Sequence, residues 1–111
     1  MSRPHRRGLI GAAVAIGLLI ALPVQAVAPV PDDMSMGNPN ARVTVIEYGS
    51  ARCPHCARFN NDIFPAFKAK YVDTGRVRYV FREFLTEPVN LAAVSFLLAR
   101  CAGKDKYFSV L

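Results

Sequence analysis

The sequence lacks internal repeats, low-complexity blocks and any apolar run long enough to form a membrane-spanning helix. Its longest apolar run covers residues 9–22, which is 14 residues, whereas about 20 are needed to cross a bilayer. A composition of 52% hydrophobic and 20% charged residues is not that of a disordered polymer. A chain of 111 residues suffices for at most one domain.

Acidic residues are also scarce, with 8 Asp and Glu against 14 Lys and Arg, a net charge of +6. Arg3, Arg6 and Arg7 precede every acidic residue, so that from Val27 onward the surplus falls to 11 against 8, or +3. A scattered surplus of this size is weak support for nucleic-acid binding. We therefore expect no nucleic-acid partner.

Cysteine is scarce as well, and the chain contains only Cys53, Cys56 and Cys101. Covalent haem attachment requires Cys-x-x-Cys-His, but Ala57 follows the second cysteine, which argues against it. There is no second Cys-x-x-Cys, so a structural zinc site would have to combine the three cysteines with His55 or His5, which we consider the weaker alternative. A purely structural disulfide also stays open, although so short a loop restrains the unfolded chain little.

Residues 1–26 have the pattern of a secretory signal peptide. A basic stretch is followed by the apolar run, Pro23 ends the run, and Val24-Gln25-Ala26 provides small residues for cleavage. We predict that the mature chain begins at Val27 and lies in the periplasm or another extracytoplasmic compartment. An uncleaved segment anchored in the inner membrane is the alternative, and Arg6-Arg7 loosely resembles a twin-arginine signal.

The remaining chain predicts an α/β fold. Residues 27–40 are rich in proline, aspartate and glycine and are interpreted as a linker. Residues 42–48 and 77–84 are rich in β-branched and aromatic residues and predict two strands, joined by a helix that starts at Cys53 and is interrupted by Pro65. A strand–helix–strand order predicts a parallel pair.

The helix that starts at Cys53 is expected to bury a stripe of residues at three- and four-residue steps: Cys56, Phe59, Ile63, Phe67 and Tyr71. A second helix is predicted at residues 87–102, and residues 105–111 are expected to begin a third. The apolar side of the helix at residues 87–102 is expected to consist of Leu91, Val94, Leu97 and Leu98.

The Cys53-Pro54-His55-Cys56 segment is the strongest chemical signal in the sequence. Thiols three residues apart on a first helical turn can form a disulfide with little backbone movement. A sulfur at a helix N-terminus meets unpaired N–H groups that stabilise its thiolate. We therefore predict that Cys53 is the attacking thiolate and Cys56 the more buried resolving thiol. Pro54 fits the first turn, and His55 is expected to add positive charge or a hydrogen bond near Cys53.

Three segments together resemble the DsbA-like branch of the thioredoxin superfamily: residues 38–48, the Cys-Pro-His-Cys motif, and residues 77–83. The resemblance implies a thioredoxin-like fold, with residues 41–86 as its N-terminal β-α-β part and residues 87–111 as the start of an inserted helical domain. It also implies an oxidising Cys53–Cys56 pair. The family's cis-proline and later strands have no counterpart here, so the fold is expected to be incomplete and truncated.

The resemblance gives two further residues an expected role. Glu47 lies six residues before Cys53, where the family has a buried acid that handles the proton of the buried cysteine. A salt bridge to a basic neighbour is the alternative. Cys101 falls on the helical insert and is expected to be a buried apolar filler, although a second redox partner or a link to another chain stays open.

The sequence thus predicts a dithiol–disulfide oxidoreductase that oxidises dithiols of exported client proteins and is reoxidised by a membrane partner. No cofactor or metal is expected. A reductase or isomerase on the same fold is the enzymatic alternative, and a non-catalytic metal- or partner-binding fragment is the alternative of another class.

Overall fold

The computed structural model describes residues 30–111. The predicted signal peptide, residues 1–26, and the predicted start at Val27 lie outside these residues. Within them the elements follow in this order: β1 (Met34–Gly37), β2 (Val43–Gly49), α1 (Pro54–Arg58), η1 (Phe59–Ile63), α2 (Phe64–Phe67), η2 (Lys68–Val72), β3 (Val77–Glu83), α3 (Val89–Cys101) and α4 (Tyr107–Val110). The predicted α/β class is confirmed.

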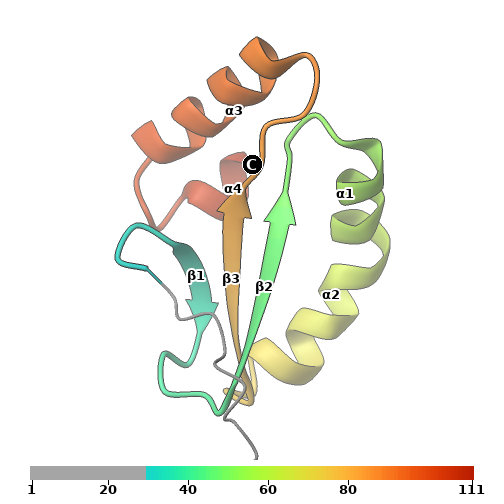
Figure 1. Cartoon of the computed structure of the whole chain (residues 1–111). Coiled ribbons are helices and arrows are strands. Elements are labelled where there is room, and N and C mark those ends of the chain that lie inside the picture. The colour runs from blue at the N-terminus through green and yellow to red at the C-terminus, as the bar shows by residue number, and fades with distance from the viewer. Residues whose placement is uncertain (1–29) are drawn as a thin grey trace, which may run out of the picture.

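A three-stranded sheet with the order β1-β3-β2 forms the centre of the fold (Figure 1). Strands β2 and β3 are parallel, with Val45 opposite Tyr79 and Glu47 opposite Phe81. The two strands expected from the sequence, and their parallel pairing through a helical connection, are therefore confirmed.

Strand β1 corrects the interpretation of residues 27–40 as a linker. Met34–Gly37 pairs antiparallel with β3, and Met34 lies opposite Phe81. Four residues, Met-Ser-Met-Gly, carry too little β-propensity to predict a strand, so its pairing depends on β3 being present. The Asp33 carboxylate, which accepts hydrogen bonds of 2.9 Å from Nε and Nη2 of Arg82, fixes the entrance to the strand. This guanidinium holds the pKa of Asp33 below its usual value.

The connection between β2 and β3 is helical over residues 54–72 but alternates between α-type and π-type winding, with π-type turns in η1 and η2. Segment η1 is a π-type turn that separates α1 from α2, at the place where Pro65 was predicted to interrupt the helix. A proline ring clashes with the carbonyl four residues earlier in a regular α-helix, and a wider turn relieves this clash.

The wider turn also changes one member of the buried stripe of this connection, while Phe67 and Tyr71 pack against the core as expected. Ile63, expected to be buried, is 56% exposed. Its neighbour Phe64 packs against Tyr79 instead, with ring centroids 4.6 Å apart. The expectation for Ile63 was wrong because it assumed a uniform period of 3.6 residues.

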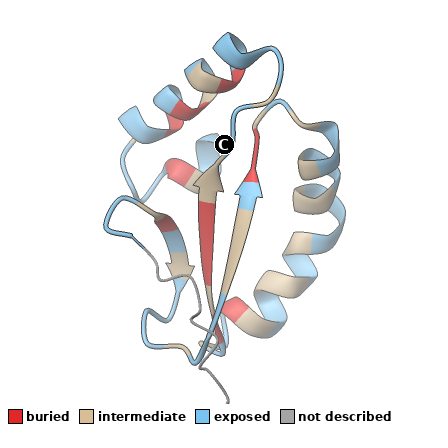
Figure 2. Ribbon diagram, in the orientation of Figure 1, coloured by how far each residue is buried: buried red, intermediate tan, exposed pale blue. Residues whose placement is uncertain are grey.

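Strand β3 is the most buried strand of the sheet (Figure 2). Its alternate residues Val77, Tyr79 and Phe81 belong to the hydrophobic core. The ring of Tyr79 meets Phe64 from α2 and Phe108 from α4. The ring of Phe81 lies 6.2 Å from that of Phe96 in α3. Helices from both halves of the chain therefore cover one patch of aromatic side chains on β3.

Helix α3 forms where expected but packs through a different face. Ala92, Phe96 and Ala99 are buried. The four side chains predicted to be its apolar side are 45–62% exposed: Leu91, Val94, Leu97 and Leu98. The helix is apolar on nearly every side, so periodicity alone could not select the contacting face.

Cys101, at the end of α3, is exposed rather than a buried filler. It is the last residue of the helix, before the chain turns through Gly103 to α4, which packs on the sheet. No helix within residues 30–111 is long and apolar enough to cross a membrane.

Candidate functional site

The turn between β2 and α1 positions the cysteine pair. Ser50 is 4% exposed and shares a 2.8 Å hydrogen bond with the hydroxyl of Thr86, which follows β3. The N–H of Cys53 donates to the Ser50 carbonyl at 3.2 Å, and the N–H of Arg52 donates to the Ser50 hydroxyl at the same distance. Ser50 thus ties the turn to the loop that follows the neighbouring strand.

Cys53 is the N-cap residue of α1, with extended backbone angles (φ −88°, ψ 117°). Its carbonyl accepts the first helical hydrogen bond, from Ala57 at 3.1 Å. Pro54 occupies the first turn, where its missing N–H leaves no helical bond unmade. The thiol of Cys53 is therefore held at the open end of the helix, beside N–H groups that have no carbonyl partner.

These N–H groups lower the pKa of Cys53. The largest contribution is a hydrogen bond from the backbone N–H of Cys56, followed by one from the Cys56 thiol, and the N–H of His55 adds to them. His55 is exposed, and its contribution to the lowered pKa of Cys53 comes from its backbone N–H and not from its imidazole. A low pKa raises the fraction of the reactive thiolate.

Cys56 has the opposite tendency. Burial raises the pKa of its thiol, and the adjacent sulfur of Cys53 and the charge of Glu47 raise it further. Both cysteines are free thiols of intermediate exposure. One sulfur of the pair is thus suited to carry negative charge, and the other to hold a proton.

Glu47 on β2 lies close enough to the pair for its charge to act on Cys56. Its Oε2 accepts a hydrogen bond from the Tyr79 hydroxyl, and its Oε1 accepts one of 3.4 Å from Nδ2 of Asn60. The same Asn60 nitrogen donates to the Cys56 carbonyl at 3.0 Å. Among residues 30–111 the carboxylate has these neutral donors as partners and no salt bridge, so the sequence-based alternative of a salt bridge is not what the structure shows.

A cavity of about 560 Å³ opens beside the buried side of the pair. Cys56, Asn60 and Tyr79 contribute to its wall, together with Phe64 and Phe108. It is large enough for water beside the Cys56 thiol. The structure therefore joins Cys53, Cys56 and Glu47 in one site.

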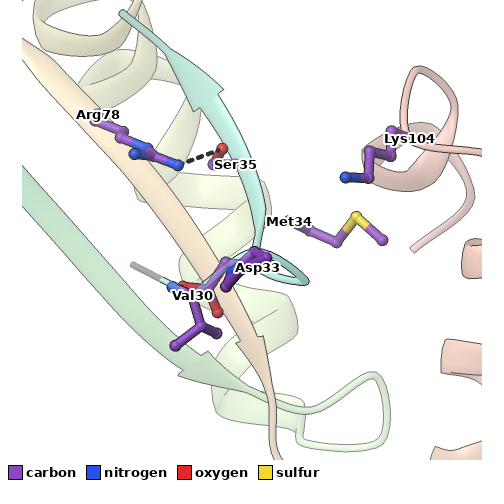
Figure 3. Close-up of a pocket in the computed structure, with 7 residues that line it drawn as sticks. Val30, Asp33, Met34, Ser35, Arg78 and Lys104 are labelled. Carbon is purple, nitrogen blue, oxygen red and sulfur yellow. Dashed lines mark hydrogen bonds between the residues drawn. The ribbon is translucent and has the colours of Figure 1, made fainter. Parts of the chain in front are cut away.

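A smaller cavity, of about 390 Å³, lies beside β1 and away from the cysteines (Figure 3). Arg78 donates to the Ser35 hydroxyl there at 3.4 Å, and Lys104 reaches the cavity from the turn after α3. None of the residues predicted to be functional lines it.

Cys101 is not brought to the site, and it lies on the exposed end of α3. Within residues 30–111, no three His, Cys, Asp or Glu side chains gather closely enough to hold a metal ion. The zinc alternative thus finds no ligand cluster in this part of the chain.

Tyr79, Asn60 and Ser50 were not identified from the sequence as part of the site. Asn60 lies four residues after Cys56, on the same side of a helical segment, and this spacing is a usable signal. Nothing in the sequence links Tyr79 to Glu47, because that contact depends on the register between β2 and β3.

We expect Cys53 to be alkylated by iodoacetamide at least tenfold faster than Cys56 near pH 6. An ordinary cysteine has a pKa of about 8.5 and is only about 0.3% thiolate at this pH. The pKa of Cys53 is lowered, so its thiolate persists as the pH falls, whereas the raised pKa of Cys56 removes its thiolate sooner.

Rate-resolved labelling of the reduced protein with peptide mass mapping measures this difference, and exposed Cys101 is the internal reference. Equal rates at the three cysteines, or fastest labelling of Cys101, would contradict the assignment.

Comparison with known proteins decides the family. The family model described as thioredoxin matches residues 30–111. The chain belongs to the thioredoxin family. Within this family its similarity is to DsbA-like thiol–disulfide oxidoreductases. The crystal structure of Wolbachia pipientis alpha-DsbA1 superposes with a TM-score of 0.68 and 36% identity, over 74% of this chain and 41% of that one.

Relatives by sequence agree with this placement in the thioredoxin family. A Rickettsia typhi protein provisionally named a protein-disulfide oxidoreductase is 49% identical over 77 residues, which are 69% of this chain and 28% of that protein. Disulfide bond formation protein D of Bacillus subtilis is 44% identical over 46 residues, 41% of this chain and 21% of that protein. The chain thus spans less than a third of the length of these relatives.

Proposed function

We propose that the protein is a dithiol–disulfide oxidoreductase that oxidises exported client proteins through Cys53 and Cys56. The observation that carries this proposal is the opposite pKa shift of the two thiols across one helical turn. A stabilised Cys53 thiolate favours the reduced pair, which makes the corresponding disulfide a strong oxidant.

The cycle begins with a Cys53–Cys56 disulfide. A client thiolate attacks Sγ of Cys53, the disulfide breaks, and Cys56 leaves as a thiolate that takes up a proton. A second client thiolate then attacks the client sulfur of the mixed disulfide, and Cys53 leaves as the stabilised thiolate. Two electrons pass from the client to the pair, and a membrane partner removes them to restore the disulfide.

The remaining site residues support these steps in the proposal. Pro54 shapes the first turn, and His55 presents its N–H to the Cys53 sulfur. Glu47 exchanges the proton of Cys56. The signal-like residues 1–26 and the need for an oxidising compartment support a periplasmic or other extracytoplasmic location.

A redox titration against glutathione tests the oxidising role. We expect a reduction potential nearer to about −120 mV, which DsbA illustrates, than to the about −270 mV of thioredoxin. The same preparation should oxidise a reduced dithiol peptide in stoichiometric amounts. A potential near the thioredoxin value would instead support a reductase, and a protein that purifies with one bound metal per chain would support the metal-binding alternative.

A further inference from the structure

The Glu47 carboxylate is held from two sides by elements that are far apart in the sequence. Tyr79 reaches it from β3, 32 residues away, and Asn60 reaches it from η1, 13 residues away. Asn60 also donates to the carbonyl of Cys56, so one amide connects the acid to the backbone of the resolving cysteine. Tyr79 itself is 1% exposed and packs under Phe64, which leaves its hydroxyl little freedom to point elsewhere.

The groups that surround this acid are neutral or already paired. Cys56 faces it from α1, Asn60 from η1, and Tyr79 from β3, where Phe81 is the residue opposite Glu47 in the register. Lys68 lines the same cavity, but its ammonium lies 2.6 Å from Asp73.

Two further titratable groups act on the neighbours of Glu47. The Cys53 sulfur raises the pKa of Cys56, and Tyr107 raises that of Tyr79, while the Tyr107 hydroxyl donates to Glu83 at 2.9 Å. Among the described residues, the Glu47 carboxylate is therefore held by two hydrogen-bond donors and by no cation. A hydrogen bond donated to a carboxylate favours its charged form.

We propose that Tyr79 is a positioning residue for the resolving step: together with Asn60 it fixes the Glu47 carboxylate beside Cys56. This inference rests on the proposed function. This step belongs to the restoration of the disulfide, when a mixed disulfide joins Cys53 to the oxidising partner. The S–H proton of Cys56 passes to Glu47, directly or through water in the cavity. The Cys56 sulfur then attacks Sγ of Cys53, the Cys53–Cys56 bond forms as the bond to the oxidising partner breaks, and that partner's sulfur leaves as a thiolate with the electron pair.

Burial and the Glu47 charge raise the pKa of Tyr79, so its hydroxyl keeps its proton over the working range and stays a donor throughout. A phenol in this place can orient the acid without exchanging the proton itself.

The experiment follows thionitrobenzoate release when the reduced protein, in a Cys101→Ser background, reacts with one equivalent of dithiobis(nitrobenzoate). The first phase is attack by Cys53 and depends on reagent concentration. The second phase is attack by Cys56 on the mixed disulfide and is unimolecular. Its rate is measured as a function of pH for each variant.

We expect Glu47→Gln to slow the second phase by about 10²-fold, the lower end of what a general base contributes, and to leave the first phase unchanged within about twofold. In the plot of second-phase rate against pH, Tyr79→Phe should move the acid limb, where the rate falls with falling pH, to higher pH by about one unit. The reason is that the carboxylate loses a hydrogen-bond donor that favours its charged form. Asn60→Ala should move it in the same direction by less. A purely structural role would lower the amplitude of both phases without moving the limb.

Tyr107→Phe is the matched control, since it removes the hydroxyl of another buried tyrosine that donates to another glutamate, and it should leave the limb in place. The inference is overturned if the Tyr79→Phe profile coincides with that of Tyr107→Phe while the parent protein shows both phases. If circular dichroism shows that Tyr79→Phe does not fold, an unshifted limb for Asn60→Ala overturns it equally. Failure of the proposed function is distinguishable, because the parent protein itself would then lack a rapid first phase or any second phase.

Discussion

Cys53→Ser is expected to abolish oxidation of a reduced dithiol peptide, a loss on the order of 10³-fold or more, because the sulfur that the client attacks is gone. Cys56→Ser should lose turnover to a similar degree but for a different reason. Its Cys53 can still form a mixed disulfide by attacking a disulfide-bonded client or a disulfide reagent, and no neighbouring thiol can displace the sulfur bound to it. The two variants therefore differ in the species that accumulate.

Non-reducing electrophoresis and intact-protein mass spectrometry measure these species. We expect mixed disulfides with Cys56→Ser and none with Cys53→Ser. Cys101→Ser is the matched control, as it removes an exposed cysteine outside the site and should leave both turnover and adducts unchanged. Adducts formed through Cys101, or equal accumulation in both active-pair variants, would speak against the assigned roles.

Phe96→Ala should destabilise the fold by about 3–5 kcal/mol, whereas Leu97→Ala should change the free energy of unfolding by less than about 0.5 kcal/mol. Phe96 is 3% exposed, and its ring lies against Phe81 on the sheet, so its loss opens a cavity in the core. Leu97 is 60% exposed and leaves no cavity when it is truncated. A loss of this size is a large part of the about 5–15 kcal/mol that holds a whole domain together.

Urea denaturation followed by circular dichroism compares the two variants with the parent chain. The neighbouring positions control for helix propensity, because both substitutions introduce alanine into the middle of α3. A larger loss with Leu97→Ala than with Phe96→Ala would show that the face predicted from the sequence, and not the face seen in the structure, packs against the sheet.

Local patterns in the sequence predicted the strand β2, the helix that begins at the cysteine pair, the strand β3 and helix α3. Each of these depends on propensities and on punctuation by proline and glycine within a few residues. Two wrong expectations share one cause, since strand β1 and the buried face of α3 are decided by contacts with distant elements. Propensity and periodicity do not contain that information. The exchange of Ile63 for Phe64 has a local cause instead, the π-type turn before Pro65.

In the candidate site, too, some features follow from local sequence and others from tertiary contacts. The sequence by itself determined that Cys53 begins a helix with Cys56 one turn later, because the motif and the strand before it are local. The N–H groups that lower the pKa of Cys53 belong to His55 and Cys56, within the same motif. Only the tertiary structure decided what holds Glu47. The parallel register of β2 and β3 brings the Tyr79 hydroxyl to the carboxylate, and η1 brings Asn60. A hydrogen bond between residues 32 positions apart exists only once the strands have paired, and no local pattern encodes that pairing.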